Sequence, residues 1–69
     1  MTDEAVREPI LQFFTHDHLP QKLAEISEPF CKLAFHIAAT LPRNAERSVA
    51  LRKLLESKDA AVRASLAHP

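Results

Sequence analysis

The fold is decided by residues 19–41, which read LPQKLAEISEPFCKLAFHIAATL. Large apolar residues recur there in alternating steps of four and three, and at about 100° per residue they fall within about 80° of one another on a helix. A second stripe of small residues runs beside this seam and lets another helix approach closely. The pattern predicts a helix that is buried on two sides. The seam is Leu19, Leu23, Ile26, Phe30, Leu33, Ile37 and Leu41, and the small stripe is Ala24, Ser27, Cys31, Ala34 and Ala38.

Two prolines bear on the start and the shape of this helix. Pro20 suits a first helical turn, where its missing N–H costs no hydrogen bond. Pro29 removes one hydrogen bond from the interior, but the apolar seam keeps its phase across it. We therefore expect one kinked helix rather than two, although Ser27 could instead cap a new helix.

A second helix is predicted after residues 41–44, which read LPRN. Pro42 disfavours helical backbone at the residue before it. Asn44 is a good N-cap, and Glu46 lies in the first turn, where the helix dipole favours an anion. The second helix should span residues 45–66 and form a hairpin with the first.

The chain is too short to be stable on its own core. A single core in a chain of this size rarely supplies more than about 3–5 kcal/mol, and the one cysteine of the 69 residues allows no internal disulfide. The absence of glycine disfavours tight β-hairpins. We expect an all-α protein, a helical hairpin with a short N-terminal arm that assembles into a symmetric oligomeric helical bundle. Residues 1–18 form the arm, with a short helix near residues 8–14, and residues 19–69 form the hairpin oligomerisation domain.

The formal net charge is zero, but the charges are unevenly placed. Residues 1–30 carry two basic and six acidic groups, whereas residues 31–69 carry seven basic and three acidic groups. Complementary subunits explain this asymmetry, and so does a small anionic ligand on the basic half. A DNA-binding domain would normally be net basic, no apolar run approaches the about 20 residues of a membrane span, and the N-terminus is acidic where a signal peptide is basic. We expect a cytoplasmic protein that binds neither DNA nor membranes.

Two cations of the second helix, Arg47 and Lys58, fall inside its apolar sector. A cation placed there needs an anionic partner or a route to water. Either they pair with a carboxylate of another subunit or reach the edge of the seam, or they line a pocket between subunits and bind ligand phosphates. The outer face of the same helix should carry a solvated lattice of i,i+4 pairs. Those pairs are Arg52–Glu56 and Asp59–Arg63.

Aromatic and basic side chains gather just before the first helix. Aromatic rings beside a cation can stack a base and hold its phosphate. Phe14, His18 and Lys22 are therefore candidate ligand contacts, although Phe13 and Phe14 could instead cap the hairpin core. His16 belongs to the same cluster.

Neither a metal site nor a catalytic site is predicted. The histidines and the cysteine match no zinc spacing, and no nucleophile–base order or paired-carboxylate context is present. A hairpin of this size offers no deep pocket of its own. We expect no enzymatic activity and no cofactor. The residues considered as metal ligands are His16, His18, Cys31, His36 and His68.

The hairpin sequence resembles a known family. Residues 41–64, LPRNAERSVALRKLLESKDAAVRA, preceded by residues 18–40, HLPQKLAEISEPFCKLAFHIAAT, are similar to the small helical-hairpin domain of phage anti-defence proteins, the anti-CBASS and anti-Thoeris sponges. The resemblance covers about two thirds of the chain. The shared pattern here is Pro42, Asn44, Glu46-Arg47, Ala50-Leu51 and Leu54.

This resemblance implies sequestration of a nucleotide signal. Such proteins bind cyclic di- or trinucleotides, or related nucleotides, without cleaving them, and assemble as homo-oligomers, often hexamers, with pockets between subunits. Their arm aromatic and nearby lysine would correspond here to Phe14 and Lys22. The location would be the host cytoplasm if the chain is phage-encoded. The alternative function is a small helical assembly or adaptor protein whose basic residues only bind other subunits.

Overall fold

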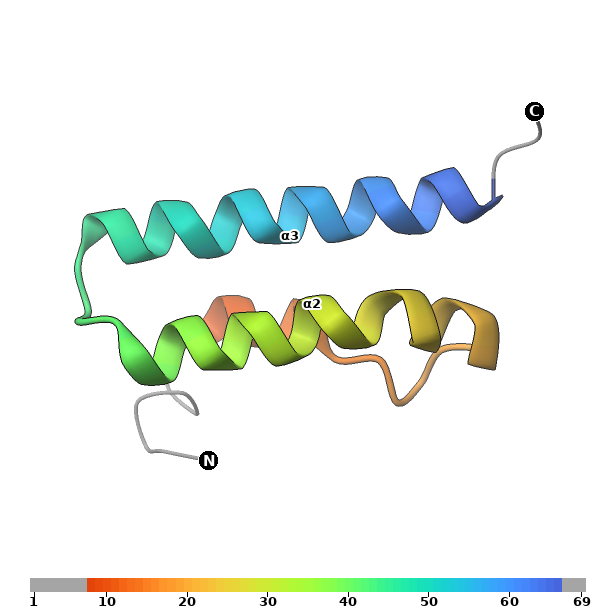
Figure 1. The fold of residues 1–69 in the computed structure, drawn as a ribbon, viewed down its shortest axis with the longest axis horizontal. Coiled ribbons are helices and arrows are strands. Elements are labelled where there is room, and N and C mark those ends of the chain that lie inside the picture. Colours follow the sequence, from red (N-terminus) through yellow and green to blue (C-terminus); the bar gives the residue numbers. More distant parts are fainter. Residues whose placement is uncertain (1–7, 67–69) are drawn as a thin grey trace.

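The structure, a computed structural model, describes residues 8–66 and is all-helical over that range. A short 3₁₀ helix, η1 (Pro9–Phe14), precedes two long α-helices, α2 (Gln21–Thr40) and α3 (Ala45–Leu66). The two long helices run antiparallel as a hairpin, and η1 packs behind them (Figure 1). The predicted all-α hairpin with an arm is confirmed. The ends of the predicted arm and hairpin domain, residues 1–7 and 67–69, lie outside the described residues.

α2 is a single helix that continues through Pro29, as its unbroken apolar phase predicted. It begins at Gln21, because Pro20 itself keeps an extended backbone with ψ 151°. It ends at Thr40, where Leu41 turns extended with ψ 146° ahead of Pro42. Ser27 therefore does not start a new helix.

α3 has the predicted bounds, and its start has the predicted cap. The Asn44 Oδ1 atom accepts a 2.9 Å hydrogen bond from the Arg47 backbone N–H. This is the N-cap bond that satisfies one of the free donors of a first helical turn. Glu46 lies in that turn, where its negative charge faces the positive end of the helix dipole.

The stripe of α2 that the single chain buries is the small-residue stripe. Ser27, Ala34 and Ala38 are fully buried, whereas Leu33 and Leu41 of the large seam remain 46% and 45% exposed. The close approach of another helix that this stripe predicts is therefore made by α3 of the same chain. In the larger seam, Leu33 and Leu41 are exposed, whereas Phe30 and Ile37 are partly buried and pack against the core.

η1 completes the core from one side. Its Leu11 and Phe14 are buried against the hairpin, while partly buried Phe35 and Leu55 pack around them. In a 3₁₀ helix, residues three apart stack in one row, so Leu11 and Phe14 enter the core together. Within residues 8–66, no helix combines the length and the apolar character needed to cross a membrane.

Candidate functional site

An open groove of about 400 Å³ lies between η1 and α3. This volume is within the usual range for small-molecule sites, about 300–1,000 Å³. Its lining combines apolar and polar side chains. It is lined by Glu8, Pro9, Ile10, Phe13, Ser48, Arg52 and Leu55.

The groove presents one accessible aromatic ring, that of Phe13. The three-residue repeat of η1 that sends Leu11 and Phe14 into the core gives Ile10 and Phe13 a second row, and this row lines the groove. Phe13 is 57% exposed, whereas Phe14 has no exposed surface. The prediction that Phe14 is the aromatic ring in contact with a ligand is wrong. In this fold Phe14 is a core residue, and Phe13 is the ring that a ligand can reach.

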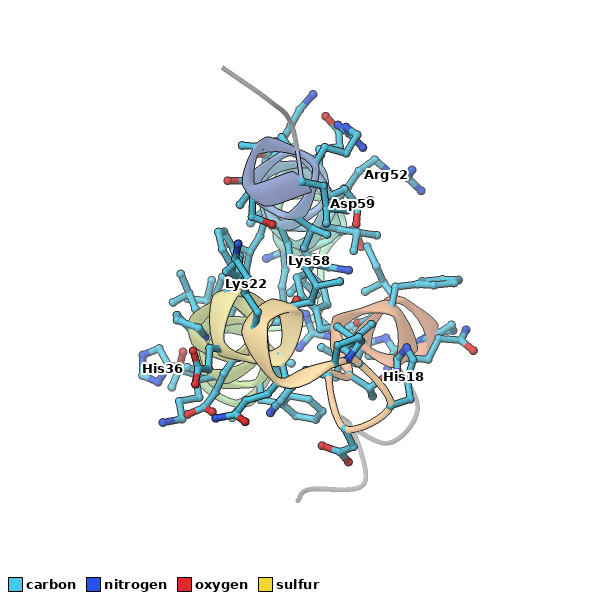
Figure 2. The ribbon with its side chains drawn as sticks, turned by 90° about the vertical axis from the view of Figure 1, so that its right-hand side faces the viewer. His18, Lys22, His36, Arg52, Lys58 and Asp59 are labelled. Carbon is cyan, nitrogen blue, oxygen red and sulfur yellow. The ribbon has the colours of Figure 1, made fainter. Side chains whose placement is uncertain are left out.

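Arg52 supplies the positive charge of the groove. Figure 2 shows its side chain extending from α3 on the side where η1 lies. The predicted Arg52–Glu56 and Asp59–Arg63 pairs do not form; instead, Lys53 lies 3.7 Å from Glu56 and Lys58 lies 3.0 Å from Asp59. Within the described residues, Arg52 has no carboxylate partner, so its guanidinium is available to an anion.

Arg47 lies beside this groove and links three segments of the chain. Its guanidinium lies 2.8 Å from the Glu8 carboxylate, and it also donates to the carbonyl oxygens of Ala38 at 3.0 Å and Leu41 at 3.2 Å. The predicted placement of Arg47 in the apolar sector is confirmed, because only 2% of the residue is exposed. Its carboxylate partner comes from the arm of the same chain. Arg47 therefore joins the arm, the end of α2 and the start of α3.

The Glu8–Arg47 ion pair determines the net charge that the groove presents to a ligand. Glu8 lines the groove, and an unpaired carboxylate there would repel an anionic ligand. Because its charge is compensated by Arg47 at 2.8 Å, the charge that remains uncompensated at the groove is that of Arg52. The groove is therefore suited to a ligand that combines an apolar ring with a negative group.

Lys58 is also largely buried, with 13% of its side chain exposed, and it pairs with the neighbouring Asp59. Figure 2 shows it between α3 and α2. The predicted position of Lys58 inside the apolar sector is confirmed. Its ammonium group is held by Asp59 of the same helix, and Lys58 is not among the residues that line the groove.

The fold does not bring the predicted arm residues together. His18 and Lys22 are exposed, and Figure 2 shows His18 on the η1 side and Lys22 on the α2 side of the molecule. Phe14 precedes both in the sequence and lies inside the core. Phe14, His18 and Lys22 therefore do not form one site within this chain.

The Cys31 thiol is a weak nucleophile in this fold. Burial raises the pKa of the Cys31 thiol, and the nearby Asp17 and Glu28 carboxylates raise it further. A thiol with a raised pKa is protonated at neutral pH and is a weak nucleophile. Among the residues that the structure describes, no group of three or more histidine, cysteine, aspartate or glutamate side chains is arranged to hold a metal ion.

The sequence contained a partial signal for the groove. The i,i+3 spacing of Ile10 and Phe13 is visible in it, and Ser48, Arg52 and Leu55 lie on one helix face at steps of four and three. Only the fold shows that these two rows face each other. No protein family, curated protein or solved structure matches this chain.

Proposed function

We propose that the protein is a non-enzymatic, homo-oligomeric sponge that binds a cyclic oligonucleotide or related nucleotide signal in the groove between η1 and α3. The observation that carries this proposal is the exposed Phe13 ring in the same groove as Arg52, which has no carboxylate partner among residues 8–66. An aromatic ring stacks a base, and an arginine holds a phosphate with two parallel hydrogen bonds. The resemblance of the hairpin to anti-CBASS and anti-Thoeris sponges supports the same ligand class.

The groove in one chain suits one base and one phosphate. Its apolar lining residues Ile10 and Leu55 offer apolar contact, and the Ser48 hydroxyl offers hydrogen bonding. A cyclic di- or trinucleotide has further bases and phosphates, which would extend beyond the groove toward another subunit. The proposed assembly, a hexamer in the family that the chain resembles, would supply those contacts.

The test is a thermal-shift and calorimetric screen with cyclic di-GMP, cyclic GMP-AMP, cyclic tri-AMP and ADP-ribose. A nucleotide present at 100 times its Kd stabilises the fold by about 2.7 kcal/mol. Phe13→Ala and Arg52→Met should each weaken binding at least tenfold. Arg63→Met is the matched control, because it removes the same charge from α3 outside the groove.

Sequestration further requires that the bound nucleotide stays intact. Chromatography of the nucleotide released by denaturing the complex should return the starting compound. A linearised or hydrolysed product would exclude a sponge. Equal binding by wild type, Phe13→Ala and Arg52→Met would exclude the groove as the site.

The second candidate function is a helical assembly or adaptor protein without a nucleotide ligand. Two observations favour it. The two cations predicted to bind phosphate, Arg47 and Lys58, are paired with carboxylates of the same chain, and the large seam of α2 remains partly exposed. Absence of any thermal shift in the nucleotide screen, with self-association retained, would select this function.

A further inference from the structure

Among the described residues that line the groove, Glu8 is the acidic one. Its side chain is 12% exposed, and its Oε2 atom lies 2.8 Å from Nη2 of Arg47. Its Oε1 atom accepts no hydrogen bond within residues 8–66, yet it is not enclosed by protein atoms. One carboxylate oxygen thus belongs to the fold, and the other is available to a ligand in the groove.

The Glu8 carboxylate is held in a fixed position. The guanidinium that binds it is itself anchored from the other side, because its Nη1 atom donates to the carbonyl oxygens of Ala38 and Leu41. Glu8 also directly precedes η1, which packs against both long helices. An acceptor that is already in place loses little freedom when a ligand binds, so it contributes to both affinity and selectivity.

The Oε1 atom restricts which chemical groups can lie beside it. An ionised carboxylate accepts hydrogen bonds and donates none. The ion pair with Arg47 offsets the negative charge of Glu8, but it leaves the lone pairs of Oε1 unused. The part of a ligand that lies against Glu8 must therefore present N–H or O–H donors, and an acceptor placed there is repelled.

The nucleobases differ in this respect. Guanine presents two adjacent donors, its N1–H and its N2 amino group, and one carboxylate oxygen has the lone pairs to accept both. The amino groups of adenine and cytosine lie next to a ring nitrogen that is an acceptor, and the N3–H of uracil lies between two carbonyl oxygens. Each of these bases would turn an acceptor toward the carboxylate.

We propose that the groove selects guanine, and that Glu8 is the residue that determines this specificity. The base lies against the Phe13 ring and donates its N1–H and N2 amino hydrogens to Glu8, while a phosphate of the same nucleotide pairs with Arg52. Phe13 and Arg52 do not discriminate between bases, because every base has a ring face and every nucleotide has a phosphate. This inference rests on the proposed function and adds the identity of the base.

The first test is calorimetry of the wild-type chain with cyclic di-GMP, cyclic di-IMP and cyclic di-AMP. Hypoxanthine, the base of cyclic di-IMP, keeps the N1–H of guanine and lacks only its amino group. Cyclic di-GMP should bind about tenfold or more tightly than cyclic di-AMP, with cyclic di-IMP between them. Equal or tighter binding of cyclic di-AMP, or binding of none of the three, would overturn this inference while another nucleotide of the screen still supports the proposed function. Binding of no nucleotide at all would overturn both.

The second test is the same comparison with Glu8→Gln. The amide oxygen of the variant can accept the Arg47 hydrogen bond, which places the amide N–H₂ donor at the position of Oε1. That donor opposes the donors of guanine and matches the N1 acceptor of adenine, so the preference for cyclic di-GMP should disappear or reverse. Glu56→Gln is the control, because Glu56 is exposed and does not line the groove. Circular dichroism checks that each variant is folded. An equal loss of affinity for both nucleotides in Glu8→Gln would mean that Glu8 only holds the arm, and would overturn the inference.

Discussion

The two ends of the hairpin are packed differently. At the turn end, where η1 and residues 34–51 meet, Ala34, Ala38 and Leu51 are at most 1% exposed and the buried Arg47 is paired. At the open end, residues 21–27 and 58–66, only Ser27 is buried to that degree, and Leu66 is 61% exposed. Polar groups follow the same division. Arg47 binds Glu8 and two carbonyls, whereas the buried Ser27 hydroxyl has no hydrogen-bond partner within the described residues.

The turn end of the hairpin is therefore packed within the single chain, whereas the open end leaves apolar surface that another molecule could cover. The turn end has η1 as a third element, so three segments enclose each buried side chain. The open end has only two helices, which cannot enclose a core between them. The proposed self-association would give the open end the additional helices it lacks. The turn end should therefore govern the stability of one chain, and the open end should respond to concentration.

The largest effect is expected from Arg47→Met at the turn end. The substitution leaves the Glu8 carboxylate buried without its cation, and removing one partner of a buried pair costs about 3–5 kcal/mol. That loss is comparable to the whole stability expected of a chain this short, about 3–5 kcal/mol, so the variant should be largely unfolded. Urea denaturation followed by circular dichroism at fixed protein concentration measures this. Arg52→Met, on the exposed side of the same helix, should change stability by about 0.5 kcal/mol or less. Equal midpoints for the two variants would mean that the pair does not hold the arm.

The next largest effect is a difference in the loss of stability between two leucine-to-alanine substitutions in α3. Leu51→Ala at the turn end removes a fully buried side chain, and such changes cost about 2–5 kcal/mol. Leu66→Ala at the open end removes a side chain that is 61% exposed, and it should cost less than about 1 kcal/mol. Thermal unfolding of both variants at two protein concentrations checks the contrast. A loss for Leu66→Ala as large as that for Leu51→Ala would show that the open end is packed as firmly as the turn end.

A smaller effect of opposite sign is expected from Ser27→Ala. Its hydroxyl is fully buried and has no hydrogen-bond partner in the part of the chain that the structure describes. An unsatisfied hydroxyl costs about 1–3 kcal/mol relative to a satisfied group, so alanine should stabilise the chain by about 1 kcal/mol. Ser48→Ala serves as the control, because Ser48 is exposed and water can replace the 3.4 Å hydrogen bond from its hydroxyl to the Asn44 carbonyl, which leaves mainly the higher helix propensity of alanine. Chemical denaturation resolves the difference. A destabilised Ser27→Ala would imply that the hydroxyl has a partner outside residues 8–66 or in another copy.

The sequence predicted the helices well because their signals are local. The apolar phase across Pro29, the effect of Pro42 on the preceding residue and the cap at Asn44 each involve residues within a few positions of one another. It did not predict which stripe of α2 meets α3. Both stripes of α2 are apolar, and only the hairpin packing shows that the small one with Ala34 is buried within the chain.

The site was less predictable because it depends on contacts between distant segments. Glu8 and Arg47 are 39 residues apart, and no local pattern links them. Of the two adjacent phenylalanines, only the 3₁₀ geometry of η1 decides that Phe14 is buried and Phe13 exposed. Arg52 was predicted to pair with Glu56, but Lys53, its neighbour in the sequence, takes that carboxylate, and Lys58 takes the Asp59 carboxylate predicted for Arg63.

The smallest effect is expected at the exposed pair on α2, where Lys32 lies 2.9 Å from Glu28. The hydrogen bond from Lys32 and its positive charge lower the pKa of Glu28 below the ordinary value of 4.5. A carboxyl group whose pKa is lower in the folded chain adds stability above its unfolded pKa, and this contribution is lost as the pH falls through the folded value. Glu28→Gln should therefore leave the stability–pH curve unchanged in shape at neutral pH and flatten it slightly below about pH 4.5. Thermal midpoints measured from pH 6 to pH 3 test this, and the difference should shrink in about 1 M salt, which screens exposed charges. Parallel curves for the two chains at low salt would mean that Lys32 does not hold Glu28 in solution.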